Sequence, residues 1–344
     1  MQAPSPAPLR AGEGRSSVLP GPFAEASAAP SVGAALREDA MKIGMMLPHL
    51  GTEMSPALVV EAAKRAEALE YDSLWVVERL LYPTKPRSKY PVTPDGSLPK
   101  MYAQGLSPIE TLTYVAAHTS RIALGTGVLV MPLHNPVVLA RQLATLDVLS
   151  GGRLRVGLGQ GWSLDEIEAA GGTLEGRASR ADEFVQVLKA VWTTDPAEFR
   201  GKHFTLPRSI LQPKPIQQPH PPIYLAGEAP GALKRVGQVA NGWMPVVSLA
   251  ETWKLMAQVR EAAWAAGRDP SELELVMFAF PAILEHSPGD DRPDFVGTLD
   301  EIRRDASIAR DFGASEIIFG PGYATGDLVA SEYLDALERL RDLG

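Results

Sequence analysis

The sequence predicts an α/β fold of the (β/α)8 TIM-barrel class, with insertions at the carboxyl-terminal face of the barrel. From Met41 to Gly344, short apolar runs alternate with amphipathic stretches, which is the pattern of successive βα units. Roughly eight such units follow one another. A doubly wound sheet usually has fewer strands and one dominant loop at its switch point, so the closed barrel is the better interpretation. The length of 344 residues is also compatible with one barrel domain.

The first half of this domain alternates predicted strands with predicted helices. The first apolar run ends before Pro48, and Ser55 followed by Pro56 gives the first helix an N-cap and a proline at its first position. Ser107 and Glu110 have the spacing of a capping box, which predicts the start of the second helix. Strands are predicted at residues 42–47, 73–77, 122–130 and 153–158, and helices include residues 55–69, 137–149 and 180–192.

The second half continues this alternation and contains two of three long connections. Strands are predicted at residues 223–226, 243–247, 273–280 and 316–320, and helices at residues 231–239, 251–266, 300–312 and 327–342. The connections at residues 78–104 and 286–298 follow predicted strands, where barrel enzymes place their catalytic residues. Residues 195–222 precede a strand instead. We expect them to run along the outside of the barrel, with a small hairpin near residues 199–206.

Charge and cysteine content narrow the class of partner. The formal net charge of -8 disfavours nucleic acid, because phosphate binding needs a basic surface. Basic residues are scattered along the chain, so no membrane-surface patch is predicted. The chain has no cysteine, which excludes disulfides, thiol nucleophiles and thiolate metal sites. This composition fits a reducing cytoplasm, and we expect a cytoplasmic protein whose partner is a small-molecule substrate.

The first forty residues differ from the rest. Residues 1–40 are rich in Ala, Pro, Ser and Gly and poor in large apolar side chains, so we expect a disordered tail before a single domain at residues 41–344. The tail lacks the continuous apolar stretch of a secretory signal. No later run is long enough to span a bilayer.

Two turns rich in small residues are candidates for binding phosphate. Gly157–Gly161 follows a predicted strand, and its alternate glycines would let a ligand approach the backbone. Its spacing is not the dinucleotide fingerprint and no helix is predicted directly after it, so taken alone a tight strand exit is the better interpretation. Ala226–Gly231 follows the next strand and precedes a helix, whose N-terminal amides could hold an anion. Two such turns on neighbouring strands favour a phosphate site more strongly than either one.

The predicted strand at residues 122–130 has glycines inside it. Glycine weakens a strand unless the backbone bulges or a ligand comes close, so Gly127 and Val128 could lie beneath a planar ring. Core packing is the alternative.

Charged residues and histidines at strand ends are the catalytic candidates. Glu78 and Arg79 close the second predicted strand, with Tyr82 nearby. A carboxylate beside a guanidinium should stay ionised, and the arginine could orient a substrate carboxylate or stabilise an anionic ring. A structural ion pair is the alternative. His49 follows the first strand, where a catalytic base could lie. The histidines form no zinc motif, so no metal is predicted.

Residues 124–162 resemble the bacterial luciferase-like superfamily closely. The matching run is LGTGVLVMPLHNPVVLARQLATLDVLSGGRLRVGLGQGW, and the resemblance extends over essentially all of residues 41–344. The overall pattern is most similar to the branch of coenzyme F-420-dependent oxidoreductases. The resemblance implies an α/β barrel, a cofactor at its carboxyl-terminal face and a homodimer.

The resemblance also implies roles for individual residues. A cis peptide between Gly127 and Val128 would support the cofactor ring, which would lie beside Glu78 and Arg79. We expect the loop at residues 78–104, with Lys85, Lys89 and Tyr90, to cover the site and help select the substrate, with Tyr82 and Tyr90 as substrate contacts. The remaining cofactor contacts implied are Gly159, Gln160, Gly161, Trp162, Arg180, Gly227, Glu228 and Ala229.

One residue departs from the family pattern. Many members have an acidic residue followed by a catalytic histidine at the end of the second strand, and this chain has Arg79 there. The proton could come from Glu78, from His49 or from solvent, or hydride transfer could need no protein acid. We expect hydride transfer between coenzyme F-420, a deazaflavin, and a small organic substrate. The alternatives are an FMN-dependent monooxygenase of the luciferase-like type and a non-catalytic flavin-binding barrel.

Overall fold

Parallel strands close into the predicted barrel in the order β1-β12-β9-β8-β7-β4-β3-β2. The structure is a computed structural model that describes residues 41–93, 95–323 and 326–343; the expected tail at residues 1–40 lies outside the described residues. The barrel strands are β1 (Lys42–Met46), β2 (Ser73–Val76), β3 (Ala123–Val130), β4 (Leu154–Gly159), β7 (Ile223–Leu225), β8 (Gly242–Trp243), β9 (Glu274–Ala279) and β12 (Glu316–Phe319).

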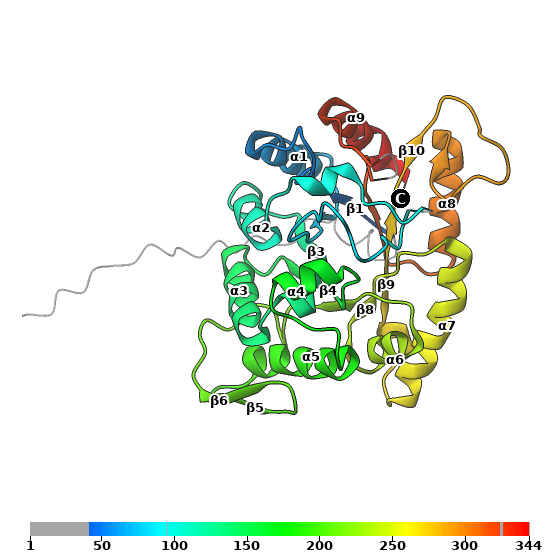
Figure 1. Cartoon of the computed structure of the whole chain (residues 1–344). Coiled ribbons are helices and arrows are strands. Elements are labelled where there is room, and N and C mark those ends of the chain that lie inside the picture. Colours follow the sequence, from blue (N-terminus) through cyan, green and yellow to red (C-terminus); the bar gives the residue numbers. More distant parts are fainter. Residues whose placement is uncertain (1–40, 94, 324–325, 344) are drawn as a thin grey trace, which may run out of the picture. The chain divides into compact units, whose positions relative to one another are not determined.

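Helices surround the strands, as Figure 1 shows. They are α1 (Pro56–Ala68), α2 (Pro108–Ala116), α3 (Pro136–Leu149), α4 (Leu164–Ala169), α5 (Arg177–Thr193), α6 (Pro230–Val239), α7 (Leu249–Ala265), α8 (Leu299–Asp311) and α9 (Ala330–Leu340). Shorter 3-10 helices are η1 (Lys100–Ala103), η2 (Met131–Leu133), η3 (Pro270–Glu272) and η4 (Arg341–Leu343). The alternation of strands and helices confirms the barrel class.

Three local predictions need correction. Strand β8 has only two residues, because Pro245 follows it closely and has no N–H to donate to a neighbouring strand. A short helix, α4, begins at Leu164 soon after the glycine turn, although no helix was predicted there. Ser107 precedes α2 but its side chain accepts no hydrogen bond from the helix, so the predicted capping box is absent.

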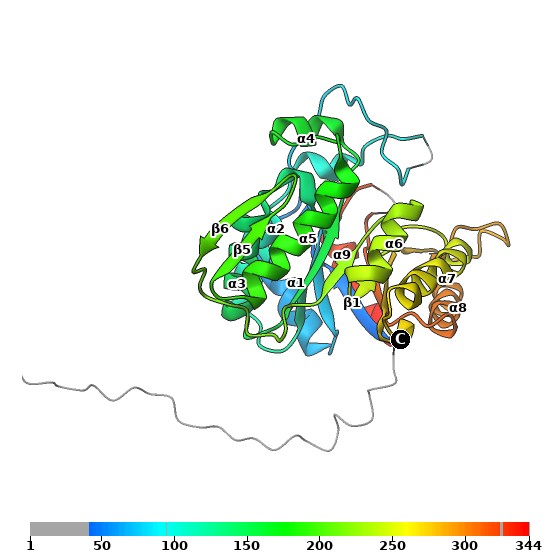
Figure 2. The same ribbon diagram turned by 90° about the horizontal axis from the view of Figure 1, so that it is seen from below.

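The long connections form small sheets or cover one end of the barrel. β5 (Ala197–Arg200) and β6 (Thr205–Ser209) form the expected antiparallel hairpin, which lies outside the barrel beside α5 in Figure 2. β10 (Ala282–Ile283) and β11 (Val296–Gly297) form a second small sheet. In Figure 2 the loop after β2 and helix α4 lie together at the top of the view. Contacts between Arg87 and Asp165 join these two segments.

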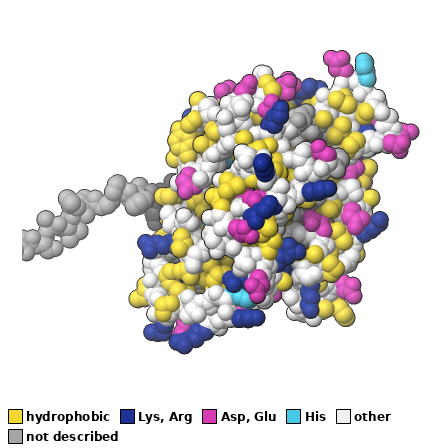
Figure 3. All heavy atoms as spheres, viewed as in Figure 1, with side chains coloured by type: hydrophobic (Ala, Val, Ile, Leu, Met, Phe, Trp, Pro, Cys, Tyr) yellow, Lys and Arg dark blue, Asp and Glu magenta, His cyan; other side chains and the backbone are white. Residues whose placement is uncertain are grey.

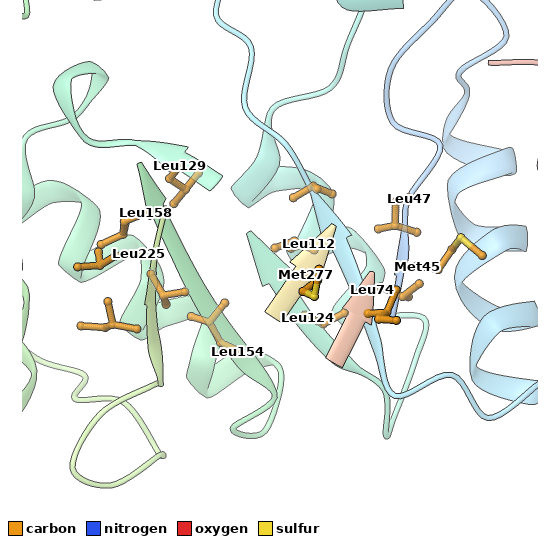
Figure 4. Close-up of a cluster of buried hydrophobic side chains, with 14 of the residues drawn as sticks. Met45, Leu47, Leu74, Leu112, Leu124, Leu129, Leu154, Leu158, Leu225 and Met277 are labelled. Carbon is orange, nitrogen blue, oxygen red and sulfur yellow. The ribbon is translucent and has the colours of Figure 1, made fainter. Parts of the chain in front are cut away.

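The apolar core has two parts. The larger part fills the space between strands and helices, and Figure 4 shows several of its leucine and methionine side chains. The smaller part lies inside the barrel and includes Met46, Trp75, Met244 and Phe278. Val128, Phe280 and Tyr323 pack against this smaller cluster.

Candidate functional site

A cavity of about 400 Å³ lies at the carboxyl-terminal ends of the barrel strands; we call it the main cavity. This is the face where barrel enzymes carry their chemistry. Most of the predicted site residues line it together: Glu78, Arg79, Tyr90, Gly127, Val128, Gly159, Gln160, Gly161, Trp162, Gly227, Glu228 and Ala229. His49, Tyr82 and Arg180 are not among its lining residues.

His49 is buried away from the main cavity. Its Nδ1 lies 2.8 Å from the carbonyl oxygen of Leu47, and its Nε2 lies 3.0 Å from the carbonyl oxygen and 3.1 Å from the backbone nitrogen of Val77. In a neutral ring with its proton on Nδ1, Nδ1–H donates to Leu47 and Nε2 accepts from the Val77 N–H. Burial lowers the pKa of His49. The expected role of His49 as the catalytic base is not supported by this position.

Tyr82 and Arg180 also lie outside the main cavity. The Tyr82 hydroxyl is 3.4 Å from the carbonyl oxygen of Leu98 on the exposed part of the same loop. Arg180 lines a second cavity of about 330 Å³, which lies beside η2 and the start of α5. Gln160 and Arg177 line both cavities, so the two are neighbours.

Glu78 connects β2 with the end of β3. Its Oε2 accepts a hydrogen bond of 2.6 Å from the backbone nitrogen of Val130, and its Oε1 lies 2.9 Å from Nε2 of His134. The sequence interpretation assigned His134 no role at the site, because its contact with Glu78 depends on how the strand ends meet. The neighbouring residue Asn135 caps α3 by accepting from the backbone nitrogens of Val137 and Val138.

Arg79 is held between aromatic rings. Its guanidinium carbon lies 5.4 Å from the ring centre of Tyr102 and 5.0 Å from that of Trp162, which is cation–π geometry. Its Nη2 is 3.2 Å from Oε2 of Glu166 on α4. The sequence suggested a structural ion pair between Arg79 and Glu78. Arg79 does form an ion pair, but its partner is Glu166 of α4.

Both glycine turns reach the main cavity. Gly161 has φ +73° and Gly227 has φ +119°, values that L side chains rarely adopt, so each turn requires glycine. Ala229 is the N-cap of α6 and its side chain accepts no hydrogen bond from the first turn. Pro230 has no N–H, and the N–H groups of Ala232 and Leu233 donate to the carbonyl oxygen of Ala229, which leaves the N–H of Gly231 for an anion. The peptide between Gly127 and Val128 is cis, as the resemblance implies.

The rest of the main cavity is apolar and aromatic. Its tyrosines are Tyr90, Tyr102 and Tyr323, which we call the cavity tyrosines. Burial raises the pKa of each. The hydroxyls of Tyr90 and Tyr102 are 2.7 Å apart, whereas the buried hydroxyl of Tyr323 has no hydrogen-bond partner among the described residues. Such a wall suits an uncharged ligand.

The surface charges and the arrangement of possible metal ligands were compared over the described residues. Basic, acidic and hydrophobic side chains are interspersed on the face shown in Figure 3. Among the described residues, no group of three or more His, Cys, Asp or Glu side chains could hold a metal ion. None of the described helices has the length and apolar character needed to cross a membrane.

Solved structures share the barrel. A monooxygenase of Streptomyces bottropensis superposes with a TM-score of 0.70 at 21% identity, covering 88% of this chain and 98% of that one. An F420-dependent secondary alcohol dehydrogenase, solved with an F420-acetone adduct, superposes with a TM-score of 0.69 at 19% identity, again covering 88% and 98%. These likenesses support the fold.

Sequence relatives identify the family. An uncharacterized protein of Mycobacterium tuberculosis is 34% identical over 235 residues, which cover 67% of this chain and 80% of the relative. An F420-dependent glucose-6-phosphate dehydrogenase of Amycolatopsis mediterranei is 30% identical over 231 residues, 64% of each chain. Because relatives at 30% identity are F420-dependent enzymes by name, the resemblance to the branch of coenzyme F-420-dependent oxidoreductases is confirmed. A family model described as luciferase-like monooxygenase matches residues 41–289. The chain therefore belongs to the luciferase-like monooxygenase family of enzymes.

Proposed function

We propose that this protein is an oxidoreductase that uses coenzyme F-420 to transfer hydride to or from an uncharged, largely apolar substrate. The observation that carries the proposal is the main cavity itself, which joins two glycine turns to an aromatic wall and shares Gln160 and Arg177 with the neighbouring second cavity. When bound, the deazaflavin would accept or donate the hydride, while the barrel supplies position and electrostatics.

The two turns fit the phosphate-bearing part of such a cofactor. Residues 159–162 and 227–229 line the same cavity from neighbouring strands β4 and β7. The first turn of α6 has no side-chain cap, and its Gly231 N–H remains for an anion. These residues would hold the phosphate, because helix N-termini and glycine turns favour anions.

The second cavity favours coenzyme F-420 over FMN. The two cofactors share a similar ring site and differ in the length of the tail. Arg177 lines both cavities and Arg180 lines the second, so a longer tail that reached the second cavity would meet two guanidinium groups there. FMN would leave these groups unused.

The wall of the main cavity supports an uncharged substrate. The positive charge of Arg79 is already matched by Glu166 and stacked between two rings, so it offers little attraction for a substrate phosphate or carboxylate. Phe278, Phe280 and Tyr323 contribute apolar surface. We therefore expect secondary alcohols, ketones or enones to be better substrates than glucose 6-phosphate, on which one relative acts by its name.

The first prediction concerns the phosphate site. Ala229→Asp places a carboxylate at the N-cap of α6, where aspartate supports the helix but repels a phosphate. We expect the affinity for coenzyme F-420 to fall at least tenfold, by about 1.5–3 kcal/mol. The matched control is Ala229→Asn, which has the same shape without the charge and should bind nearly as well as the wild type. The measurement is fluorescence quenching with coenzyme F-420 and FMN.

Each other outcome of this experiment has a meaning. Equal affinity of Ala229→Asp and Ala229→Asn for coenzyme F-420 would show that the phosphate does not bind at the N-terminus of α6. Tight FMN binding without coenzyme F-420 binding would favour the monooxygenase alternative. Binding of either cofactor without turnover of alcohols, ketones, enones or glucose 6-phosphate would favour a non-catalytic flavin-binding barrel.

A further inference from the structure

Glu78 and His134 form a hydrogen-bonded pair between the two cavities. Glu78 lines the main cavity, His134 lines the second cavity, and 2.9 Å separates Oε1 of the first from Nε2 of the second. The Glu78 side chain is 9% exposed and that of His134 is 19% exposed. A carboxylate at the main cavity is thus linked by one hydrogen bond to an imidazole that reaches a different opening.

Other titratable side chains of the main cavity are poor proton acceptors. The guanidinium groups of Arg79 and Arg177 have N–H donors and no acceptor atom. The cavity tyrosines have raised pKa values and stay protonated. Glu228 is exposed and lies on a glycine turn assigned to phosphate. Among the lining residues, Glu78 is the remaining carboxylate.

Glu78 and His134 have positions at which one proton could be accepted and another released. A carboxylate has about four acceptor positions. Glu78 uses them for the backbone nitrogen of Val130 and for His134, which leaves room for a substrate hydroxyl. In the described part of the chain, no hydrogen bond involves Nδ1 of His134, so that nitrogen is free to exchange a proton in the second cavity.

We propose that Glu78 and His134 form a proton relay from the substrate to the second cavity, an inference that rests on the proposed function. Alcohol oxidation starts from the neutral imidazole with its proton on Nδ1. Glu78 accepts the hydroxyl proton and passes it to the unprotonated Nε2 of His134, and Nδ1 then releases its proton to solvent. The substrate C–H bond breaks as hydride leaves for the oxidised deazaflavin, and the C=O bond forms. Two electrons therefore leave with the hydride and one proton leaves along the relay. Reduction of a carbonyl runs the same path in reverse.

The first test needs neither cofactor nor substrate. The imidazole ¹⁵N resonances of His134 are recorded by NMR in the ligand-free wild type and in Glu78→Gln, and His134→Gln identifies them. The charged groups that face His134 are Glu78 at the end of β2 and Arg177 and Arg180 of α5. Both arginines remain in both proteins, so the difference isolates Glu78. We expect Glu78→Gln to shift the Nε2 resonance of His134, because an amide oxygen or nitrogen then replaces the carboxylate oxygen 2.9 Å away. Identical imidazole resonances in the two proteins would overturn the relay.

The second test separates proton transfer from support of the fold. The enzyme is loaded with oxidised coenzyme F-420 and assayed with cyclohexanol and 1-phenylethanol. His134→Gln keeps an amide near Glu78 but cannot carry a proton. We expect kcat to fall about 100-fold and the solvent deuterium isotope effect on kcat to rise, both measured at saturating coenzyme F-420 so that a change in its Kd does not enter kcat. The matched control, His286→Gln, changes an exposed loop histidine and should leave all three values as in the wild type.

The outcomes distinguish the relay from the proposed function. Wild-type kcat and an unchanged isotope effect in His134→Gln would overturn the relay while the oxidoreductase assignment stands. A weaker Kd with unchanged kcat would make His134 a cofactor contact and overturn the relay too. Failure of the wild type to bind coenzyme F-420 would overturn the proposed function, and the NMR comparison would still show whether the pair shares a proton.

Discussion

The imidazole of His49 lies between the ends of β1 and β2 with backbone atoms of Leu47 and Val77 at both ring nitrogens. Burial lowers its pKa from the ordinary value of 6.5, although its contacts with the carbonyl oxygens of Leu47 and Val77 oppose that shift. In the unfolded chain the ring gains a proton near pH 6.5, whereas in the folded protein it stays neutral to lower pH. The unfolded state therefore holds more protons below pH 6.5, and the free energy of unfolding falls as the pH falls.

The direction of this pH dependence of the free energy of unfolding gives a prediction for His49→Gln. The variant removes one group that titrates between the folded and unfolded states, so its stability should depend less on pH below 6.5. The slope should decrease by at most about 1.4 kcal/mol per pH unit. Urea unfolding at several pH values measures both slopes. His286→Gln serves as the exposed control, and equal slopes in all three proteins would show that His49 titrates alike in both states.

Several barrel strands carry a buried polar cluster near their amino-terminal ends. Arg155 of β4 contacts Glu316 of β12, Glu274 of β9 and the hydroxyl of Tyr224 on β7. Burial lowers the pKa of Arg155, but the surrounding negative charges outweigh burial and raise it overall. Ser73 of β2 also donates to Glu316. The cluster thus joins strands that are distant along the chain at the end opposite the main cavity.

Removal of one charge from this cluster should destabilise the barrel. Glu316→Gln leaves the buried guanidinium with only Glu274, and breaking a buried ion pair costs about 3–5 kcal/mol. Glu338→Gln breaks an exposed pair with Arg65 and should cost less than about 1 kcal/mol. Urea unfolding measures both. Comparable losses in the two variants would mean that the buried cluster adds no more stability than a surface pair.

At the scale of the whole molecule, the homodimer stays a prediction. Tyr114, Val138 and Leu149 are exposed apolar side chains on α2 and α3, and burial of such surface drives association. We expect light scattering during size-exclusion chromatography to give twice the mass of the chain. The mass of a single chain across the micromolar range would contradict this expectation.

Much of the molecule follows from local sequence patterns. Apolar runs and helix caps predicted the order of strands and helices, because both depend on residues close together in the chain. The glycine turns were also visible locally, since Gly161 and Gly227 adopt backbone angles that other residues disfavour. The family resemblance added the cofactor class and the cis peptide.

The contacts of the site were decided by tertiary structure. Arg79 pairs with Glu166 and Glu78 pairs with His134, and 87 and 56 positions separate the partners along the chain. The lengths of the strands and the closure of the barrel fix such contacts, and no local spacing encodes them. Burial is likewise a property of the folded chain, which is why His49 looked like a base in the sequence and is a core residue in the structure. The sequence by itself determined the barrel and its turns, and only the closed barrel decided which carboxylate meets which cation.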